Sequence, residues 1–152
     1  FFMLLFADIN FRWAIILGAS YIVSGVMVQA MKHLLFPEMM RPAKFFEEAG
    51  RQIHLVGGMD HHSYLSFPSG HAASAFAVFI SLALFSNKRL WQLLFTFLAM
   101  LVAFSRVYLS QHFVMDIWAG ALIGCVCVAF AWKILKTRGN SWLDKSIIHL
   151  CK

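Results

Sequence analysis

The sequence predicts an all-α fold, a polytopic bundle of membrane-spanning helices, and three observations support this prediction. Of the 152 residues, 61% are hydrophobic and only 13% are charged, whereas soluble domains average about 25% charged residues. Four long apolar segments each approach the roughly 20 residues that cross a hydrocarbon core as a helix. No alternating strand pattern accompanies them, so a helix bundle remains as the architecture that satisfies the backbone in lipid.

The apolar segments form a single membrane domain over residues 1–152. We expect spanning helices at about 11–36, 68–85, 90–108 and 113–135. The apolar residues 1–10 are expected to be the stub of an earlier helix, in a sequence that is a fragment of a longer chain. Residues 37–67 are expected to form a loop on the outer side of the membrane. Residues 136–152 are expected to form a cytoplasmic tail, in which Asn140 or Ser141 caps a short helix.

The basic residues orient these helices. With segments that alternate in direction, one side receives Arg12, Lys88, Arg89, Lys133, Lys136, Arg138, Lys145 and Lys152. The positive-inside rule makes that side cytoplasmic. The outer side then receives Lys32, Arg41, Lys44, Arg51 and Arg106, of which we interpret Lys44 and Arg51 as anchors for lipid headgroups. Because the net charge of +6 is placed in this way, we expect membrane lipids as partners and no nucleic acid.

The loop at 37–67 carries two features with open alternatives. An apolar stripe at helical spacing predicts a short helix in the outer interface, although an irregular loop is equally compatible: the stripe comprises Phe45, Phe46, Ala49 and Ile53. A group of four side chains resembles a metal-binding cluster: His54, Asp60, His61 and His62. We favour surface or lid residues over a metal site and expect no bound metal.

Small residues and cysteines occupy the apolar segments. Gly120 and Gly124 form a G-x-x-x-G pattern, which predicts close packing against another helix. The start of the second segment has the same character, with Ala72, Ala73, Ala75 and Ala77. Cys125 and Cys127 lie two residues apart, a spacing that suits neither a disulfide nor a zinc site. We expect these cysteines, and Cys151, to be inert thiols.

Polar residues cluster at three places that fall on the same predicted side of the membrane. The clusters are Lys32 to Arg41-Pro42, then Pro68-Ser69-Gly70-His71, and then Ser105-Arg106 with His112 and Asp116. Ionisable groups at membrane helices are costly, so these residues are functional candidates. Three of them, Lys32, Arg41 and Arg106, are cations that suit a dianionic phosphate.

The second cluster offers an anion site made by the backbone. Pro68-Ser69-Gly70-His71 stands where the second segment begins, so the free N–H groups and positive dipole end of that helix face the same anion. Gly70 permits close backbone approach, and Ser69 adds a hydroxyl group.

The two histidines suit nucleophilic and acid–base roles. His112 and Asp116 lie four residues apart and therefore share a helix face. A carboxylate that accepts from one imidazole nitrogen leaves the other nitrogen as a nucleophile. His71 is then expected to protonate the leaving group and later to take a proton from water. The cations would stand in for the Mg²⁺ of many phosphoryl-transfer enzymes.

These residues resemble the type 2 phosphatidic acid phosphatase superfamily, which also includes soluble vanadium haloperoxidases. That family has the motifs K-x6-R-P, P-S-G-H and S-R-x5-H-x3-D. The second and third match completely, at residues 68–71 and 105–116. The first departs, because eight residues separate Lys32 from Arg41. Pro37 interrupts that stretch, and we expect the two extra residues to bulge out after the helix ends.

The resemblance, which covers roughly residues 11–135, implies a six-helix membrane protein of which this chain holds the last four helices. It implies an active site at the outer membrane face, with His112 as nucleophile, Asp116 as its orienting partner and His71 as acid/base. It also implies that the phosphate is held by Lys32, Arg41, Ser69, Gly70 and Arg106.

The function that we expect is a metal-independent, cofactor-free phosphatase acting on a lipid phosphate or pyrophosphate of the bilayer. A bacterial inner membrane with a periplasmic active site is the expected location, and the oligomeric state is not predicted. The candidate lipids are undecaprenyl pyrophosphate, phosphatidylglycerol phosphate, phosphatidic acid and a lipid A phosphate. Two alternatives stay open: a lipid phosphotransferase that uses the same phosphohistidine, and a non-catalytic lipid-binding or transport protein.

Overall fold

The computed structural model describes residues 10–53, 62–136 and 143, and the elements it contains there are helical. They are α2 (Phe11–Ala30), a π-helical turn (Met31–Leu35), α3 (Pro42–Glu48), α4 (Gly70–Phe85), α5 (Arg89–Tyr108) and α6 (Val114–Lys136). The all-α prediction is therefore confirmed. Of the stub predicted at residues 1–10, residues 1–9 lie outside the described residues, as does the predicted tail helix except for Leu143.

Three of the described helices are long and apolar enough to cross a membrane: Phe11–Leu35, Arg89–Tyr108 and Val114–Lys136. Their ends agree with the predicted segments to within a residue or so. The segment predicted at 68–85 is shorter, because α4 spans only the 16 residues Gly70–Phe85. Its start is fixed by Ser69, an N-cap in extended conformation whose side chain accepts from the Ala72 N–H, and such caps stop a helix from extending further.

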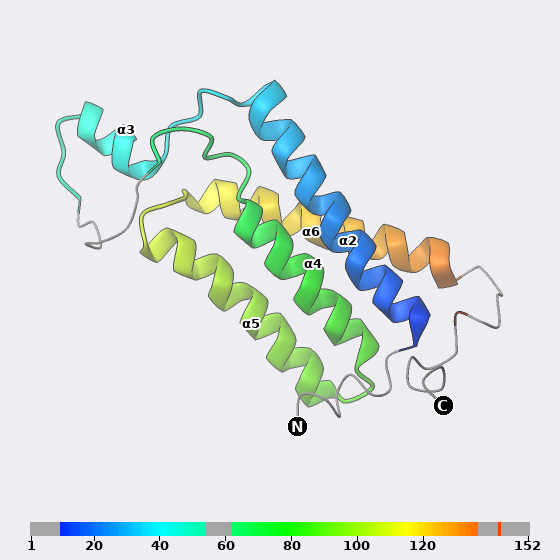
Figure 1. The fold of residues 1–152 in the computed structure, drawn as a ribbon. Helices are drawn as coiled ribbons and strands as arrows, with labels where there is room; N and C mark the ends of the chain where they lie inside the picture. Colours follow the sequence, from blue (N-terminus) through cyan, green and yellow to red (C-terminus); the bar gives the residue numbers. More distant parts are fainter. Residues whose placement is uncertain (1–9, 54–61, 137–142, 144–152) are drawn as a thin grey trace, which may run out of the picture.

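Helix α4 is the centre of the bundle. It packs against α2, α5 and α6, and α2 packs in addition against α6. Figure 1 shows α4 between α2 and α5, with α6 crossing behind and α3 set apart beyond the end of α2. The helices alternate in direction: Arg12 at the start of α2 donates to the Leu135 carbonyl near the end of α6, and the Trp13 ring meets Phe85 at the end of α4, 5.7 Å between centroids.

The closest helix contact joins α4 and α6 through the predicted glycines. A Cβ on Gly120 would overlap the carbonyl oxygen of Ser69 and lie 3.1 Å from the Ala72 Cβ. A Cβ on Gly124 would lie 2.5 Å from the Ala73 carbonyl oxygen. The G-x-x-x-G pattern thus brings two backbones together as predicted. Because Ser69 caps α4, this contact fixes the start of α4 against α6.

Two loop predictions need correction. The helix predicted in the 37–67 loop exists as α3, but it ends at Glu48, so Ala49 and Ile53 lie beyond it and the apolar stripe reduces to Phe45 and Phe46. Gly50, at a φ of +66°, follows that end, and glycine is the residue that adopts this backbone conformation without strain. The extra residues between Lys32 and Arg41 do not simply bulge after a regular helix. Instead, the end of α2 is widened into the π-helical turn Met31–Leu35.

Candidate functional site

One cavity lies where the polar ends of α2, α4, α5 and α6 meet. It has a volume of about 1270 Å³ and lies where α2 and α5 end and where α4 and α6 begin. Its polar lining includes most of the predicted site residues: Lys32, Arg41, Gly70, His71, Arg106 and His112. Residues up to 80 positions apart in sequence are therefore gathered as predicted.

The cations of the cavity are held by backbone carbonyls and by Gln111. The ammonium group of Lys32, a residue only 8% exposed, donates to the Leu65 carbonyl at 2.8 Å. The Arg41 Nε donates to the Tyr64 carbonyl at 3.1 Å, and its Nη1 donates to the Gln111 carbonyl at 3.4 Å. These contacts leave further N–H donors on each cation to meet an anion.

The irregular spacing of the first motif does not separate its two cations. A π-helical turn takes up one more residue than an α-helical turn, and Phe36 leaves the helix in a non-helical conformation. The chain then returns through Met39, whose carbonyl accepts from the Ser66 N–H at 3.0 Å, while the Arg41 N–H donates to the Ser63 carbonyl at 2.9 Å. Both Lys32 and Arg41 therefore reach the segment that precedes α4.

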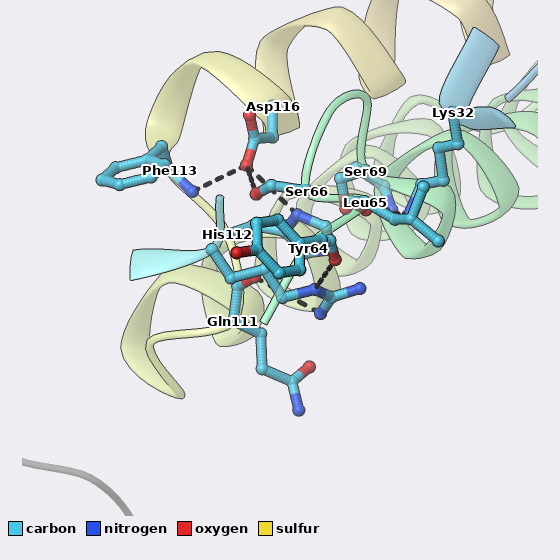
Figure 2. A network of polar contacts seen from close by, with 11 residues as sticks. Lys32, Tyr64, Leu65, Ser66, Ser69, Gln111, His112, Phe113 and Asp116 are labelled. Atoms are coloured by element: carbon cyan, nitrogen blue, oxygen red, sulfur yellow. Dashed lines mark hydrogen bonds and ion pairs between the residues drawn. The ribbon is translucent and has the colours of Figure 1, made fainter. Parts of the chain in front are cut away.

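His112 and Asp116 are in contact, as predicted, but not on one helical face. The Nδ1 of His112 lies 3.2 Å from the Asp116 Oδ2, and the side chains are almost completely buried. Only Asp116 belongs to α6, because His112 lies in the turn before the helix begins at Val114. Because Nδ1 is the nitrogen that contacts the Asp116 carboxylate, the other ring nitrogen of His112, Nε2, is not paired with that carboxylate (Figure 2).

Asp116 also caps the helix on which it stands. Its Oδ2 accepts from the Phe113 N–H at 2.9 Å, which is the contact that the third helical residue makes in a capping box. A negative charge is favoured at this position by the dipole of α6. The same oxygen accepts from the hydroxyl of Ser66. Figure 2 shows the three donors converging on Asp116 from the loop before α4 and from the start of α6.

The predicted anion turn lies beside this pair. The Ser69 N–H donates to the Asp116 carbonyl at 2.9 Å, which joins the start of α4 to the first turn of α6. Gly70 and His71 line the cavity, with His71 exposed to it. Ser69 itself is fully buried and is not part of the cavity lining, because its hydroxyl caps α4.

The surroundings of His112 shift its proton affinity. Burial lowers the pKa of His112 from its ordinary value of 6.5, and Arg41 and Lys32 act in the same direction, whereas the hydrogen bond with Asp116 raises it. The net shift is downward. This favours a neutral imidazole at neutral pH, which is the form that can attack as a nucleophile.

Three residues near the site were missed from the sequence. The Ser66 hydroxyl donates a hydrogen bond to Asp116. The backbone carbonyl of Gln111 accepts from Arg41, and its side-chain Oε1 accepts from the Arg106 Nη1 at 3.3 Å. His62 lines the cavity, although the sequence placed it only in a surface or metal cluster. The available signal was that Ser66 is close to Pro68 in sequence and Gln111 is next to His112, but Ser66 lies outside the motifs and Gln111 occupies a variable position of the third.

The remaining polar predictions have other outcomes. Lys44 faces its own helix, 3.6 Å from Glu47 and 3.4 Å from Glu48, and it does not line the cavity. Of the suspected metal cluster, His54, Asp60 and His61 lie outside the described residues. Cys125 and Cys127 are free thiols, and Cys151 lies outside the described residues.

The comparison with protein families gives a match over most of the chain. The family described as the PAP2 superfamily matches residues 13–140. Several curated relatives have names that state a phosphatase activity. A protein of Escherichia coli (strain K12), YbjG, named as a candidate undecaprenyl-diphosphatase, is 35% identical over 137 residues. Phosphatidylglycerophosphatase B of Bacillus subtilis (strain 168) is 37% identical over 73 residues, and Lipid A 4'-phosphatase of Bacteroides thetaiotaomicron is 29% identical over 122 residues.

The matched stretches differ in extent. They cover 85%, 42% and 76% of this chain, and 62%, 36% and 53% of the three relatives. This chain therefore spans less than two thirds of the length of these relatives. No solved structure matches it significantly.

Proposed function

The chain belongs to the PAP2 superfamily, and from this membership we propose that it is an integral-membrane phosphatase that hydrolyses a lipid phosphate or pyrophosphate without a metal ion. The observation that carries the proposal is that His112, which contacts the buried Asp116, lines the same cavity as His71 and three cations. A site that only bound an anion would have no use for a nucleophile and an acid together.

The first step transfers the phosphoryl group to His112. The Nε2 of His112 attacks phosphorus, the bond from phosphorus to the leaving oxygen breaks, and that oxygen takes a proton from His71. Asp116 accepts from the Nδ1–H and so stabilises the imidazolium that forms. The products of this step are the dephosphorylated lipid, or lipid monophosphate from a pyrophosphate, and a phosphohistidine.

The second step restores the enzyme. Neutral His71 removes a proton from a water molecule, whose oxygen attacks phosphorus while the bond to the His112 Nε2 breaks. Inorganic phosphate leaves, and His71 is protonated for the next cycle. Throughout, Lys32, Arg41 and Arg106 and the N–H groups at the start of α4 balance the charge on the phosphoryl oxygens. Ser69 is buried, its hydroxyl caps α4 and its N–H donates to the Asp116 carbonyl, so we assign it an indirect role: it fixes the start of α4 whose free N–H groups face the phosphate.

The shape of the cavity supports a lipid substrate. Away from its polar end, the cavity is lined mostly by apolar side chains of α2, α4 and α5: Tyr21, Ile22, Val26, Val78, Phe79 and Val102. Several of these side chains lie on spanning helices, so an acyl or isoprenoid chain can enter from the bilayer while its phosphate reaches His112. We infer that this end faces the outer, periplasmic side of a bacterial inner membrane, because eight of the 13 basic residues in the sequence are predicted to lie on the other side.

The decisive experiment measures phosphate release from candidate lipids in detergent micelles by purified full-length protein, with a chelator present. Undecaprenyl pyrophosphate, phosphatidylglycerol phosphate, phosphatidic acid and a lipid A phosphate are offered separately. We expect release from at least one, its loss in His112→Ala, and normal release in the matched control His33→Ala, since His33 is an exposed histidine outside the cavity. Absence of release from all four lipids, or equal rates in His112→Ala and wild type, would refute the phosphatase.

A further inference from the structure

We infer that Ser66 is a positioning residue for the reaction: its hydroxyl holds the Asp116 carboxylate in the orientation that directs His112. This inference rests on the proposed function and adds a member to the His112–Asp116 pair. Ser66 lies outside the three motifs, and it reaches Asp116 from a loop 50 residues earlier in the chain.

The contact is a buried one between well-anchored atoms. Ser66 is 1% exposed and Asp116 is 3% exposed, and the Ser66 hydroxyl donates to the Asp116 Oδ2. Hydrogen bonds to a charged acceptor are stronger than neutral ones, and they count for more where water is excluded. A hydroxyl at this position therefore restricts the carboxylate much more than a solvent-exposed serine could.

The geometry shows why a third donor matters. The Oδ2 of Asp116 already accepts from the Phe113 N–H, a bond that lies along the start of α6. That bond alone fixes the carboxylate relative to its own helix, but not relative to α4. Ser66 adds a restraint from the segment that leads into α4, and that segment also carries Gly70 and His71 into the cavity.

Ser66 is itself held from two directions. Its N–H donates to the Met39 carbonyl at 3.0 Å. The preceding residue, Leu65, has a φ of +59°, a backbone conformation that residues other than glycine rarely adopt. The Leu65 carbonyl accepts from the Lys32 ammonium at 2.8 Å, so a phosphate-binding cation stabilises the backbone that presents the Ser66 hydroxyl. Phosphate-binding and nucleophile-orienting parts of the site are thereby connected.

A structural alternative must be separated from this role. A serine that stabilised only the fold of the loop would, on removal, lower the stability of the protein without acting through Asp116. Substitution of Ser66 by alanine removes one small polar group and adds no volume, so we expect the protein to fold. Ser66→Cys keeps the approximate size but replaces a good donor by a weak one, and it therefore separates packing from hydrogen bonding.

The kinetic test is a double-mutant cycle that combines Ser66→Ala with Asp116→Ala. We expect Ser66→Ala to lower kcat about tenfold, the effect of losing one hydrogen bond to a charged group in the transition state, with KM changed little. Ser66→Cys should lose a similar factor, and Ser63→Ala, which removes an exposed hydroxyl from the same loop, should match wild type. In the Asp116→Ala background, removal of the Ser66 hydroxyl should have almost no further effect.

NMR spectroscopy tests the same set of variants without the need for enzyme turnover. In protein labelled with ¹⁵N-histidine, the imidazole resonances of His112 are assigned by their loss in His112→Gln. We expect Ser66→Ala to shift them, to leave the His33 resonances in place, and to have no effect once Asp116 is alanine. If wild type releases no phosphate from any lipid, the proposed function fails, while this spectrum still decides the role of Ser66.

Three results would overturn the inference. One is a Ser66→Ala variant with wild-type kcat and an unchanged His112 spectrum. Another is a Ser66→Cys variant with full activity, which would assign the serine to packing. The third is a loss that multiplies with that of Asp116→Ala, which would show that Ser66 acts independently of the carboxylate.

Discussion

Gly120 on α6 lies against the backbone of Ser69, so closely that a Cβ on the glycine would overlap the Ser69 carbonyl oxygen. Ser69 caps α4, and its N–H donates to the carbonyl of Asp116 on α6. One close approach between two helices therefore positions both the anion turn and the orienting carboxylate. The packing motif and the candidate active site are parts of the same arrangement.

The variant Gly120→Ala tests this arrangement. In a helix, alanine is more favourable than glycine by about 1 kcal/mol. Here, however, the added methyl group would overlap the backbone of α4, and the shift of α4 that relieves this overlap should cost about 1–3 kcal/mol of stability. We expect a lower unfolding temperature in detergent together with slower phosphate release. Gly18→Ala is the control, since no atom lies within 4 Å of its added Cβ, and it should unfold at or above the wild-type temperature. A Gly120→Ala protein as stable and active as wild type would contradict the packing described.

The pH dependence of kcat/KM tests the state of His112. Burial lowers the pKa of His112 below 6.5, so the neutral imidazole should persist into mildly acidic solution. The acidic limb of the plot of kcat/KM against pH should therefore have its midpoint below pH 6.5. Stability follows the same sign: between the lowered pKa and 6.5 the unfolded chain binds more protons, so this histidine destabilises the fold as the pH falls through that window. The measurement is kcat/KM for one lipid at pH values on both sides of 6.5.

The variant Asp116→Asn gives this pH prediction its control. The carboxylate raises the pKa of His112, so its removal should move the acidic limb to still lower pH while kcat falls. A shift of the acidic limb of the pH profile to higher pH would contradict the assignment of His112 as the titrating group.

Lys32 offers a test of the irregular first motif. Its ammonium group reaches the Leu65 carbonyl at 2.8 Å from a π-helical turn, so we expect it to function despite the longer spacing. Lys32→Met keeps the apolar stem and removes the charge, and it should weaken inhibition by vanadate, a mimic of five-coordinate phosphorus, about tenfold or more. Lys44→Met is the matched control, because Lys44 pairs with Glu47 and Glu48 on α3. Equal vanadate inhibition of both variants would exclude Lys32 from the anion site.

Gln111 holds the guanidinium of Arg106 through its side chain, at 3.3 Å. Gln111→Ala removes this restraint and should raise KM by roughly threefold to tenfold, the effect of one hydrogen bond. Gln111→Glu should be worse, because a carboxylate would pair with Arg106 and repel the phosphate of the substrate. Steady-state kinetics of the two variants decide the matter: a Gln111→Glu enzyme better than Gln111→Ala would show that the contact does not restrain Arg106.

The sequence by itself determined the all-α fold, the ends of the membrane-spanning helices and six residues at the polar end of the cavity: Lys32, Arg41, Gly70, His71, Arg106 and His112. These follow from local signals, because an apolar run needs a helix in lipid, Ser69 is a favourable cap, and glycines four apart mark a close helix contact. The order of the motifs also placed His71, Arg106, His112 and Asp116 at helix ends that alternate in direction, and these ends meet at one site.

Only the tertiary structure decided what holds those residues in place. Ser66 and Asp116 are 50 residues apart, Lys32 and Leu65 are 33 apart, and Arg41 and Gln111 are 70 apart. No periodicity in the sequence specifies such pairs, because each depends on where a loop crosses the end of the bundle. The π-helical turn at Met31–Leu35 belongs to the same category, since the apolar pattern of the sequence predicts one continuous helix there and does not distinguish a π-helical turn from an α-helical one.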